Sequence, residues 1–166
     1  MAKTNSFDVS TGVDLQEVDN AVNQATKEIA QRYDFKGTDC SITFDRAAAS
    51  LVLDADDAFR LEALKQVLRE KLAKRGVPLK NLDEGKVVEG TLGRHRVTIG
   101  LKQGIDQETA KTISKAVRDQ GFKKVQVQIQ KDELRVIAPA RDTLQEVMTF
   151  LRSRDFGVAL TFGNYR

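Results

Sequence analysis

Side chains that can hydrogen-bond a base or a phosphate gather in the stretch from Lys123 to Ala138. Hydrophobic residues alternate here with polar ones: Val125, Val127 and Ile129 alternate with Lys124, Gln126, Gln128 and Gln130. A period of two predicts a half-buried strand. A second strand, Glu133–Ala138, follows after Lys131 and Asp132, so the stretch predicts an antiparallel hairpin.

The register of this hairpin follows if Lys131 and Asp132 form its turn. The hydrophobic pairs are then Ile129 with Leu134, Val127 with Val136, and Val125 with Ala138. The pairs on the opposite face are Gln130 with Glu133, Gln128 with Arg135, and Gln126 with Ile137. A slip of one residue would mix the two faces. The polar face can bind bases or phosphates, and a solvated sheet surface without a ligand is the alternative.

Two further stretches carry donors for an anion. Tyr33–Gly37 places the ring of Phe35 beside the ammonium group of Lys36, a pair that can stack a base and contact a phosphate. The alternative is a helix-ending turn with Phe35 in the core. Lys102 precedes a helix N-terminus, which favours anions, although Asp106 is expected to cap that helix.

The residues needed for catalysis or metal binding are sparse. His95 is the single histidine and Cys40 the single cysteine, so neither a Ser-His-Asp triad nor a thiolate metal cluster is indicated. The chain also lacks a phosphate-binding GxxxxGK[ST] loop and a GxGxxG fingerprint. We therefore expect no enzymatic activity, no metal and no cofactor.

Composition indicates a globular protein of one domain or two small ones. The chain has 166 residues, of which 40% are hydrophobic and 31% charged. It has no hydrophobic run long enough to cross a membrane and no secretion signal at its start, so we expect a cytoplasmic protein without a membrane partner. Residues 1–93 hold 13 Lys/Arg and 16 Asp/Glu, whereas residues 94–166 hold 14 and 8. The second half is therefore the better partner for an anion.

The elements that position these side chains form an internal repeat. Strands are expected at Ser6–Thr11, Cys40–Phe44, Ser50–Asp54, Val87–Glu89, Arg94–Leu101, Lys124–Gln130, Glu133–Ala138 and Val158–Phe162. Four amphipathic helices are expected. The first three are capped at Asp14, at Asp56 or Asp57, and at Asp106, and the fourth runs from about Asp142 to Arg154. Phe59 is expected on the hydrophobic stripe of the second helix. Each half reads β-α-β-β-α-β, the pattern of ferredoxin-like and RNA-recognition folds.

Seven sequence segments resemble those of one known family. They are SFDVST, VDLQEVDNAVNQA, RYDFKG, LKQGIDQE, VQVQIQ, RDTLQ and FGNYR. Together they are specific, and on them the chain closely resembles the bacterial YajQ family along its whole length. It departs from the family pattern at Lys131, where a Gly-Asp turn is usual, and at Ala138-Pro139-Ala140, where a basic, Gly-containing loop is usual.

The resemblance implies an α+β fold of two ferredoxin-like (RNP-like) domains in tandem that exchange their N-terminal strands. Residues 12–103, including strand 94–101, would form the first domain, and residues 1–11 with 104–166 the second. Gly12 and Gly104 would lie where the chain crosses between domains, where a backbone free to adopt positive φ is useful.

The resemblance also implies a nucleotide-binding protein that is not an enzyme. Some members of the family act as cyclic di-GMP receptors together with a transcription regulator. An RNA-binding module, with tRNA as a ligand, and a protein-interaction adaptor without a ligand are the alternatives. The candidate nucleotide-binding residues are Phe35, Lys36, Lys102, Lys124, Gln126, Gln128 and Arg135.

Overall fold

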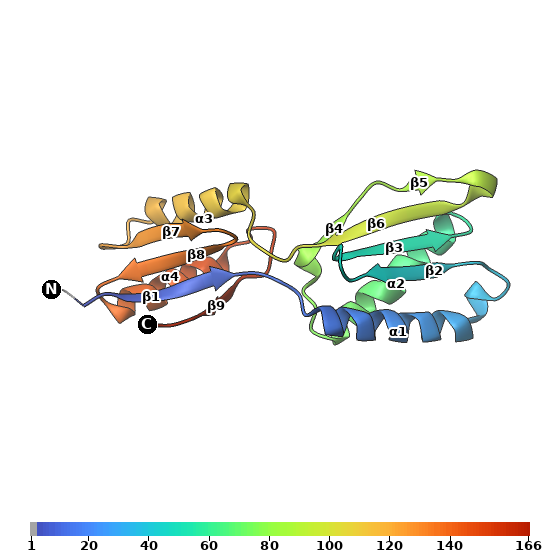
Figure 1. The fold of residues 1–166 in the computed structure, drawn as a ribbon, viewed down its shortest axis with the longest axis horizontal. Helices are drawn as coiled ribbons and strands as arrows, with labels where there is room; N and C mark the ends of the chain where they lie inside the picture. Colours follow the sequence, from blue (N-terminus) through green and yellow to red (C-terminus); the bar gives the residue numbers. More distant parts are fainter. Residues whose placement is uncertain (1–2) are drawn as a thin grey trace. The chain divides into compact units, whose positions relative to one another are not determined.

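The computed structural model describes residues 3–166 as two compact units (Figure 1). The first, here the continuous unit, is Val13–Gln103. The second, here the composite unit, joins the described residues up to Gly12 with Gly104–Arg166. Residues 1–2, expected in the second domain, lie outside the described residues. Each unit has a four-stranded core sheet and two helices, so the expected α+β class is confirmed.

The sheet of the composite unit has the order β7-β8-β1-β9, with every neighbouring pair antiparallel. Its strands are β7 (Gln126–Gln130), β8 (Glu133–Ala138), β1 (Asn5–Ser10) and β9 (Thr161–Gly163). Its helices are α3 (Gln107–Asp119) and α4 (Arg141–Ser153). Alternate strand residues such as Phe7, Val9, Leu134 and Val136 are buried with the hydrophobic stripes of both helices. The other face of the sheet therefore carries neither helix of this unit.

The continuous unit repeats this arrangement with the order β2-β3-β6-β4. Its strands are β2 (Ser41–Asp45), β3 (Ser50–Ala55), β6 (His95–Leu101) and β4 (Leu82–Glu84), and a short β5 (Val88–Glu89) also pairs with β6. Its helices are α1 (Leu15–Gln31) and α2 (Ala58–Lys74). Short 3₁₀ helices lie at Tyr33–Phe35, Leu79–Asn81 and Thr91–Gly93.

The expected exchange of first strands is confirmed. β1 precedes the continuous unit in sequence but lies between β8 and β9, with Phe7 opposite Val136 and Asp8 opposite Arg135. β6 precedes α3 but lies between β3 and β4. Both strands can do this because each has hydrophobic residues at alternate positions, which fit either helix-covered sheet.

Helix starts follow the local sequence closely. Asp14, Asp57 and Asp106 accept hydrogen bonds from the backbone amides of Gln16, Arg60 and Thr109, and so cap α1, α2 and α3. α4 instead begins after Ala140, which has no side chain able to cap it.

Four details differ from the sequence expectations. Phe59 is 71% exposed, because at the first turn of α2 it lies beside the hydrophobic stripe rather than on it. The last strand begins at Thr161, not Val158, since the chain only reaches β1 there. Strand β4 lacks an alternating pattern and was not expected. Neither Gly12 nor Gly104 is at positive φ; a Cβ on Gly104 would instead lie 2.6 Å from the Cβ of Asp132.

Candidate functional site

The helix-free face of the composite sheet, here the open face, carries the polar residues expected of the hairpin. The register is as predicted: Gln126, Gln128 and Gln130 lie opposite Ile137, Arg135 and Glu133. The exchanged strand β1 extends two of these rows, with Ser6 opposite Ile137 and Asp8 opposite Arg135. The central row is therefore Gln128, Arg135 and Asp8, from three different strands.

Arg135 is held in place by Asp8. Its Nε lies 2.9 Å from Asp8 Oδ1, and Asn164 Nδ2 donates to Asp8 Oδ2 at 2.6 Å. The hydrogen bond from Arg135 lowers the pKa of Asp8 below its ordinary value; burial opposes this shift and the hydrogen bond from Asn164 adds to it. The same bond raises the pKa of Arg135, so the guanidinium stays charged. Arg135 is thus a fixed cation, with a side chain 23% exposed and N–H groups left for a ligand.

A hollow of about 470 Å³ lies beside this row. Its walls come from the start of β7, the end of β8 and the segment before β1: Thr4, Lys124, Val125, Gln126, Ile137, Ala138 and Pro139. Lys124 adopts a left-handed backbone conformation with φ of 56° immediately before the strand. The structure therefore brings Lys124 and Gln126 together around the hydrophobic side chain of Ile137, one row from Gln128 and Arg135.

The other three candidate residues belong to the continuous unit. Phe35 is only 5% exposed, and the guanidinium of Arg32 lies 5.4 Å from its ring centroid. This burial agrees with the alternative expectation of a helix-ending turn with Phe35 in the core, and it leaves little of the ring for a base to stack on. Tyr33, two residues earlier, is the exposed aromatic residue, at 89%.

Lys36 and Lys102 have separate settings in the same unit. Lys36 follows the 3₁₀ turn and lines a shallow pocket of about 360 Å³ together with Thr38 and Cys40. Lys102 is held through its backbone, since its amide donates to Asn81 O and its carbonyl accepts from Asn81 Nδ2. Lys102 lines neither this pocket nor the one of about 310 Å³ beside Arg94 and Arg96.

The open face of the continuous unit has different chemistry. At the position of the Gln128–Arg135–Asp8 row it carries Thr43, Val52 and Thr98. Its arginines, Arg94 and Arg96, both bind Asp54, with closest N–O distances of 2.7 and 3.0 Å. The two units therefore share a fold, but they do not carry the same polar side chains on their open faces.

His95 and Cys40 have ordinary structural settings. His95 Nδ1 lies 2.8 Å from Gly93 O, and its Nε2 lies 3.5 Å from Glu89. Cys40 is a half-buried free thiol. Within residues 3–166, no three His, Cys, Asp or Glu side chains are grouped closely enough to hold a metal ion, and no helix there is long and hydrophobic enough to span a membrane.

Sequence reasoning missed the residues that organise the open face from a distance. Asp8 and Asn164 lie 127 and 156 positions from their partners Arg135 and Asp8. The expected exchange of strands could have predicted this contact, because antiparallel pairing of β1 with β8 places Asp8 opposite Arg135. Ile137 was paired with Gln126 but was not recognised as a residue that lines a hollow.

Comparison with known proteins shows to which family the chain belongs. A family model described as "Nucleotide-binding protein YajQ-like" matches residues 5–166. The chain belongs to the YajQ-like family. Its relatives include a "Nucleotide-binding protein" of Chloroherpeton thalassium, 45% identical over 166 residues, and one of Bacillus cereus strain B4264, 47% identical over 166 residues. Another, from Bacillus anthracis strain CDC 684, is 48% identical over 168 residues, and all three alignments cover 100% of both chains. The YajQ-like relatives are thus named for binding nucleotides rather than for a reaction.

Proposed function

We propose that this protein binds a nucleotide on the open face of the composite unit and does so without catalysis, in the cytoplasm. The finer proposal is a cyclic di-GMP effector that acts with a transcription regulator. The observation that carries the binding site is the convergence of Lys124, Gln126 and Ile137 in one hollow beside the fixed guanidinium of Arg135.

Each group has a role suited to a guanine nucleotide. Ile137 offers a hydrophobic surface for a base, and the amides of Gln126 and Gln128 can donate to and accept from its edge. Lys124 and Arg135 can neutralise phosphates, with Arg135 held ready by Asp8. Lys36 and Lys102 remain candidates for a separate contact from the continuous unit, whereas Phe35 is withdrawn from the site.

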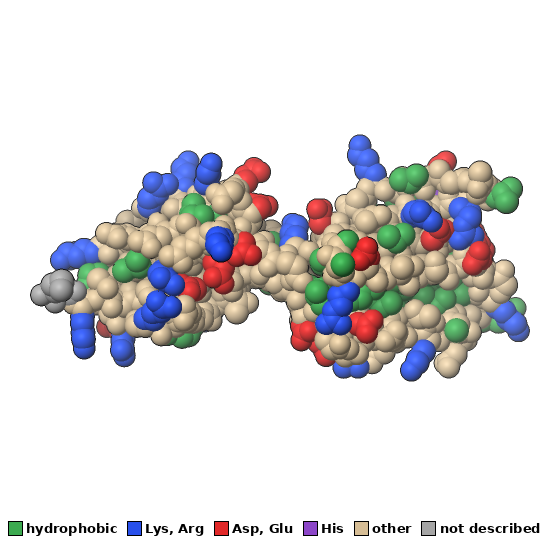
Figure 2. All heavy atoms as spheres, in the orientation of Figure 1, with side chains coloured by type: hydrophobic (Ala, Val, Ile, Leu, Met, Phe, Trp, Pro, Cys, Tyr) green, Lys and Arg blue, Asp and Glu red, His purple; other side chains and the backbone are tan. Residues whose placement is uncertain are grey.

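The charge of each unit favours a small anion over a long RNA. The composite unit contains 12 Lys/Arg and 9 Asp/Glu, and the continuous unit contains 15 of each. Lys and Arg side chains project from the composite unit beside α3 (Figure 2). A modest surplus confined to one unit suits two phosphates better than the many that a nucleic acid presents. RNA binding by this basic surface is the second candidate.

Salt dependence separates these two functions. Purified protein would be titrated with cyclic di-GMP, GTP, ATP and tRNA at rising salt. Binding of tRNA through six or more phosphates should weaken about 10³-fold between about 50 and 200 mM salt, whereas a cyclic dinucleotide should show a shallow slope. Absence of binding to all four at low salt would reject nucleotide binding and favour the adaptor.

Substitutions test the proposed residues. Gln126→Ala and Gln128→Ala should weaken binding about fivefold each, and Lys124→Ala about tenfold or more, as expected for neutral and charge-assisted hydrogen bonds. Lys115→Ala, an exposed cation on α3 of the same unit, is the matched control. Arg135 is best replaced in the double variant Asp8→Asn/Arg135→Gln, which avoids a buried unpaired carboxylate. Wild-type affinity in all these folded variants would show that the open face is only a solvated surface.

A further inference from the structure

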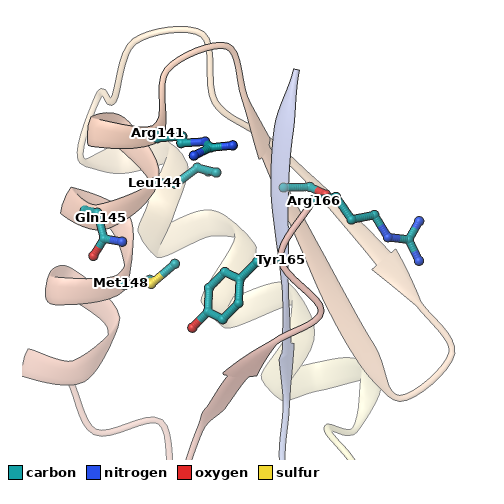
Figure 3. Close-up of a pocket in the computed structure, with 7 residues that line it drawn as sticks. Arg141, Leu144, Gln145, Met148, Tyr165 and Arg166 are labelled. Atoms are coloured by element: carbon teal, nitrogen blue, oxygen red, sulfur yellow. The ribbon is translucent and has the colours of Figure 1, made fainter. Parts of the chain in front are cut away.

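A second cavity lies on the helix side of the composite unit and shares no residue with the hollow beside Lys124. It has a volume of about 300 Å³ and lies between α4 and the chain after β9 (Figure 3). Its lining residues are Ser6, Arg141, Leu144, Gln145, Met148, Tyr165 and Arg166. None of the expectations from the sequence concerned this place.

The local sequence builds the cavity in two steps. Arg141, Leu144, Gln145 and Met148 recur at spacings of three and four, which puts them on one face of α4. Opposite them, Asn164 adopts φ of 53°, which bends the chain after β9.

Backbone pairing then fixes the side chains after that bend. The backbone of Arg166 exchanges two hydrogen bonds with Ser6, of 3.0 and 3.1 Å. The ring of Tyr165 consequently points towards Met148, while the guanidinium of Arg166 projects away from α4 (Figure 3).

The inner wall of this cavity is hydrophobic. Leu144 and Met148 are 4% and 2% exposed, and the Tyr165 ring centroid lies 6.5 Å from that of buried Phe7. Tyr165 itself is 61% exposed, and its hydroxyl reaches Phe162 O only at 3.5 Å. A large aromatic face left open above a thioether and an aliphatic floor is suited to stacking a planar ring.

The rim of the cavity is polar and positively charged. The Arg141 guanidinium donates to the amide oxygen Asn5 Oδ1 at 3.3 Å, and within residues 3–166 it forms no ion pair with an Asp or Glu side chain. Gln145 contributes a side-chain amide one turn further along α4. Asp142 in the first turn of α4 offsets the positive end of the helix dipole, so the positive charge of this rim comes from the arginine side chains. A ring bound at Tyr165 would thus have a donor and an anion partner beside it.

We propose that this cavity is a second ligand site, specific for a planar heteroaromatic ring that carries one anionic group, with a nucleoside monophosphate as the fitting class. The ring stacks on Tyr165 above Leu144 and Met148, Gln145 hydrogen-bonds its edge, and Arg141 binds the phosphate. The site does not depend on nucleotide binding at the open face, because the two sets of residues are separate.

The two tyrosines of the chain allow a direct readout. Tyr33→Phe removes the other tyrosine, which is 89% exposed and in the continuous unit, so 3-fluorotyrosine labelling then gives one ¹⁹F resonance from Tyr165. GMP should shift this resonance in a saturable manner. Guanosine, which lacks the anion, and ribose 5-phosphate, which lacks the ring, should each bind about tenfold more weakly or worse.

Matched variants decide between this site and a general charge effect. Arg141→Ala should weaken the affinity for GMP, measured from the ¹⁹F titration, about tenfold. Arg118, an exposed cation on α3 of the same unit, is the control, and Arg118→Ala should leave that affinity unchanged. Calorimetry should show loss of one GMP site in Tyr165→Leu and its retention in Tyr165→Phe.

Each contrary result has a separate meaning. If GMP binds and Lys124→Ala weakens it while the Tyr165 resonance stays fixed, the open-face proposal stands and this one is overturned. Equal effects of Arg141→Ala and Arg118→Ala also overturn it. If no titrant moves the resonance at millimolar concentration, this site is rejected, whatever the open face binds.

Discussion

Gly104 allows a direct test of the structure, because glycine is needed here for close packing against Asp132 and not for the positive φ that the sequence suggested. Its φ is ordinary, but a Cβ at this position would lie 2.6 Å from Asp132 Cβ, 2.7 Å from Asp132 Oδ2 and 3.0 Å from Asp132 Cγ. Carbon atoms in contact prefer about 3.5–4.0 Å, so Gly104→Ala requires the two segments to separate by about 1 Å.

The turn cannot move away freely. Ile105 N donates to Asp132 O at 2.9 Å, and the preceding Lys131 is held at φ of 54°. Relief of the clash would therefore strain that hydrogen bond or the hairpin turn. We expect Gly104→Ala to lower the free energy of unfolding of the composite unit by about 1–3 kcal/mol, the usual cost of overpacking.

Urea unfolding measures this loss in the right unit. In a Tyr33→Phe background, Tyr165 emission reports the composite unit alone, and the midpoint should fall by about 1 M with little change in slope. Gly163→Ala is the control, since nothing lies within 4 Å of its added Cβ and its φ is ordinary. It should change stability by less than about 0.5 kcal/mol.

A double-mutant cycle tests the stated cause. Asp132→Gly removes the clashing Cβ and should restore most of the stability lost in Gly104→Ala, giving a coupling of about 1–2 kcal/mol. Asp132→Ala keeps that Cβ and should not rescue. If Gly104→Ala is as stable as Gly163→Ala, or if both Asp132 variants rescue equally, the steric argument is refuted.

Three further predictions follow from individual side chains. Phe35→Ala should destabilise the continuous unit by about 3–5 kcal/mol in thermal unfolding, whereas Tyr33→Ala should be neutral, because Phe35 is 5% and Tyr33 is 89% exposed; equal effects would contradict the burial. The pKa of Asp8 is lowered in the folded state, so its contribution to stability is present above its ordinary value of 3.8 and is lost as pH falls through the lower folded value. Acid unfolding of Asp8→Asn should therefore show a shallower loss below about pH 3.8, and an unchanged acid limb would count against the Asp8–Arg135 bond. Leu92 is 99% exposed and adopts a left-handed backbone conformation with φ of 60°, which asparagine tolerates better than leucine. Leu92→Asn should therefore raise the free energy of unfolding by up to about 1 kcal/mol, since no packing is lost, and a clear destabilisation would argue against this conformation.

Local patterns were sufficient to predict most of the fold. The β7–β8 register follows from the alternation around Val127 and Val136, and the caps at Asp14 and Asp106 follow from their spacing to the hydrophobic stripes. Alternation could not decide where β1 pairs, because β1 and β6 fit either sheet equally well. That assignment required the resemblance to a known family.

The candidate site was less accessible to sequence reasoning because its groups converge through tertiary structure. Gln126, Gln128 and Arg135 share a face by strand periodicity, but Asp8 reaches Arg135 only through the exchanged strand. The direction of the Phe35 ring depends on a single 3₁₀ turn, for which the sequence has no periodic signal. Ile129 remains 38% exposed although it alternates correctly, because β7 is an edge strand with no neighbour beyond it.

The exchange of β1 also sets an order of events during synthesis on the ribosome. The continuous unit Val13–Gln103 supplies all strands of its own sheet and can fold once Leu101 has emerged. β1 emerges before every other strand of the two sheets, yet its neighbours β8 and β9 are made more than a hundred residues later. Until then Phe7 and Val9, both fully buried in the finished protein, remain exposed on an unpaired strand. Phe7 and Val9 thus form a hydrophobic segment that a chaperone can bind until β8 and β9 have been made and pair with β1.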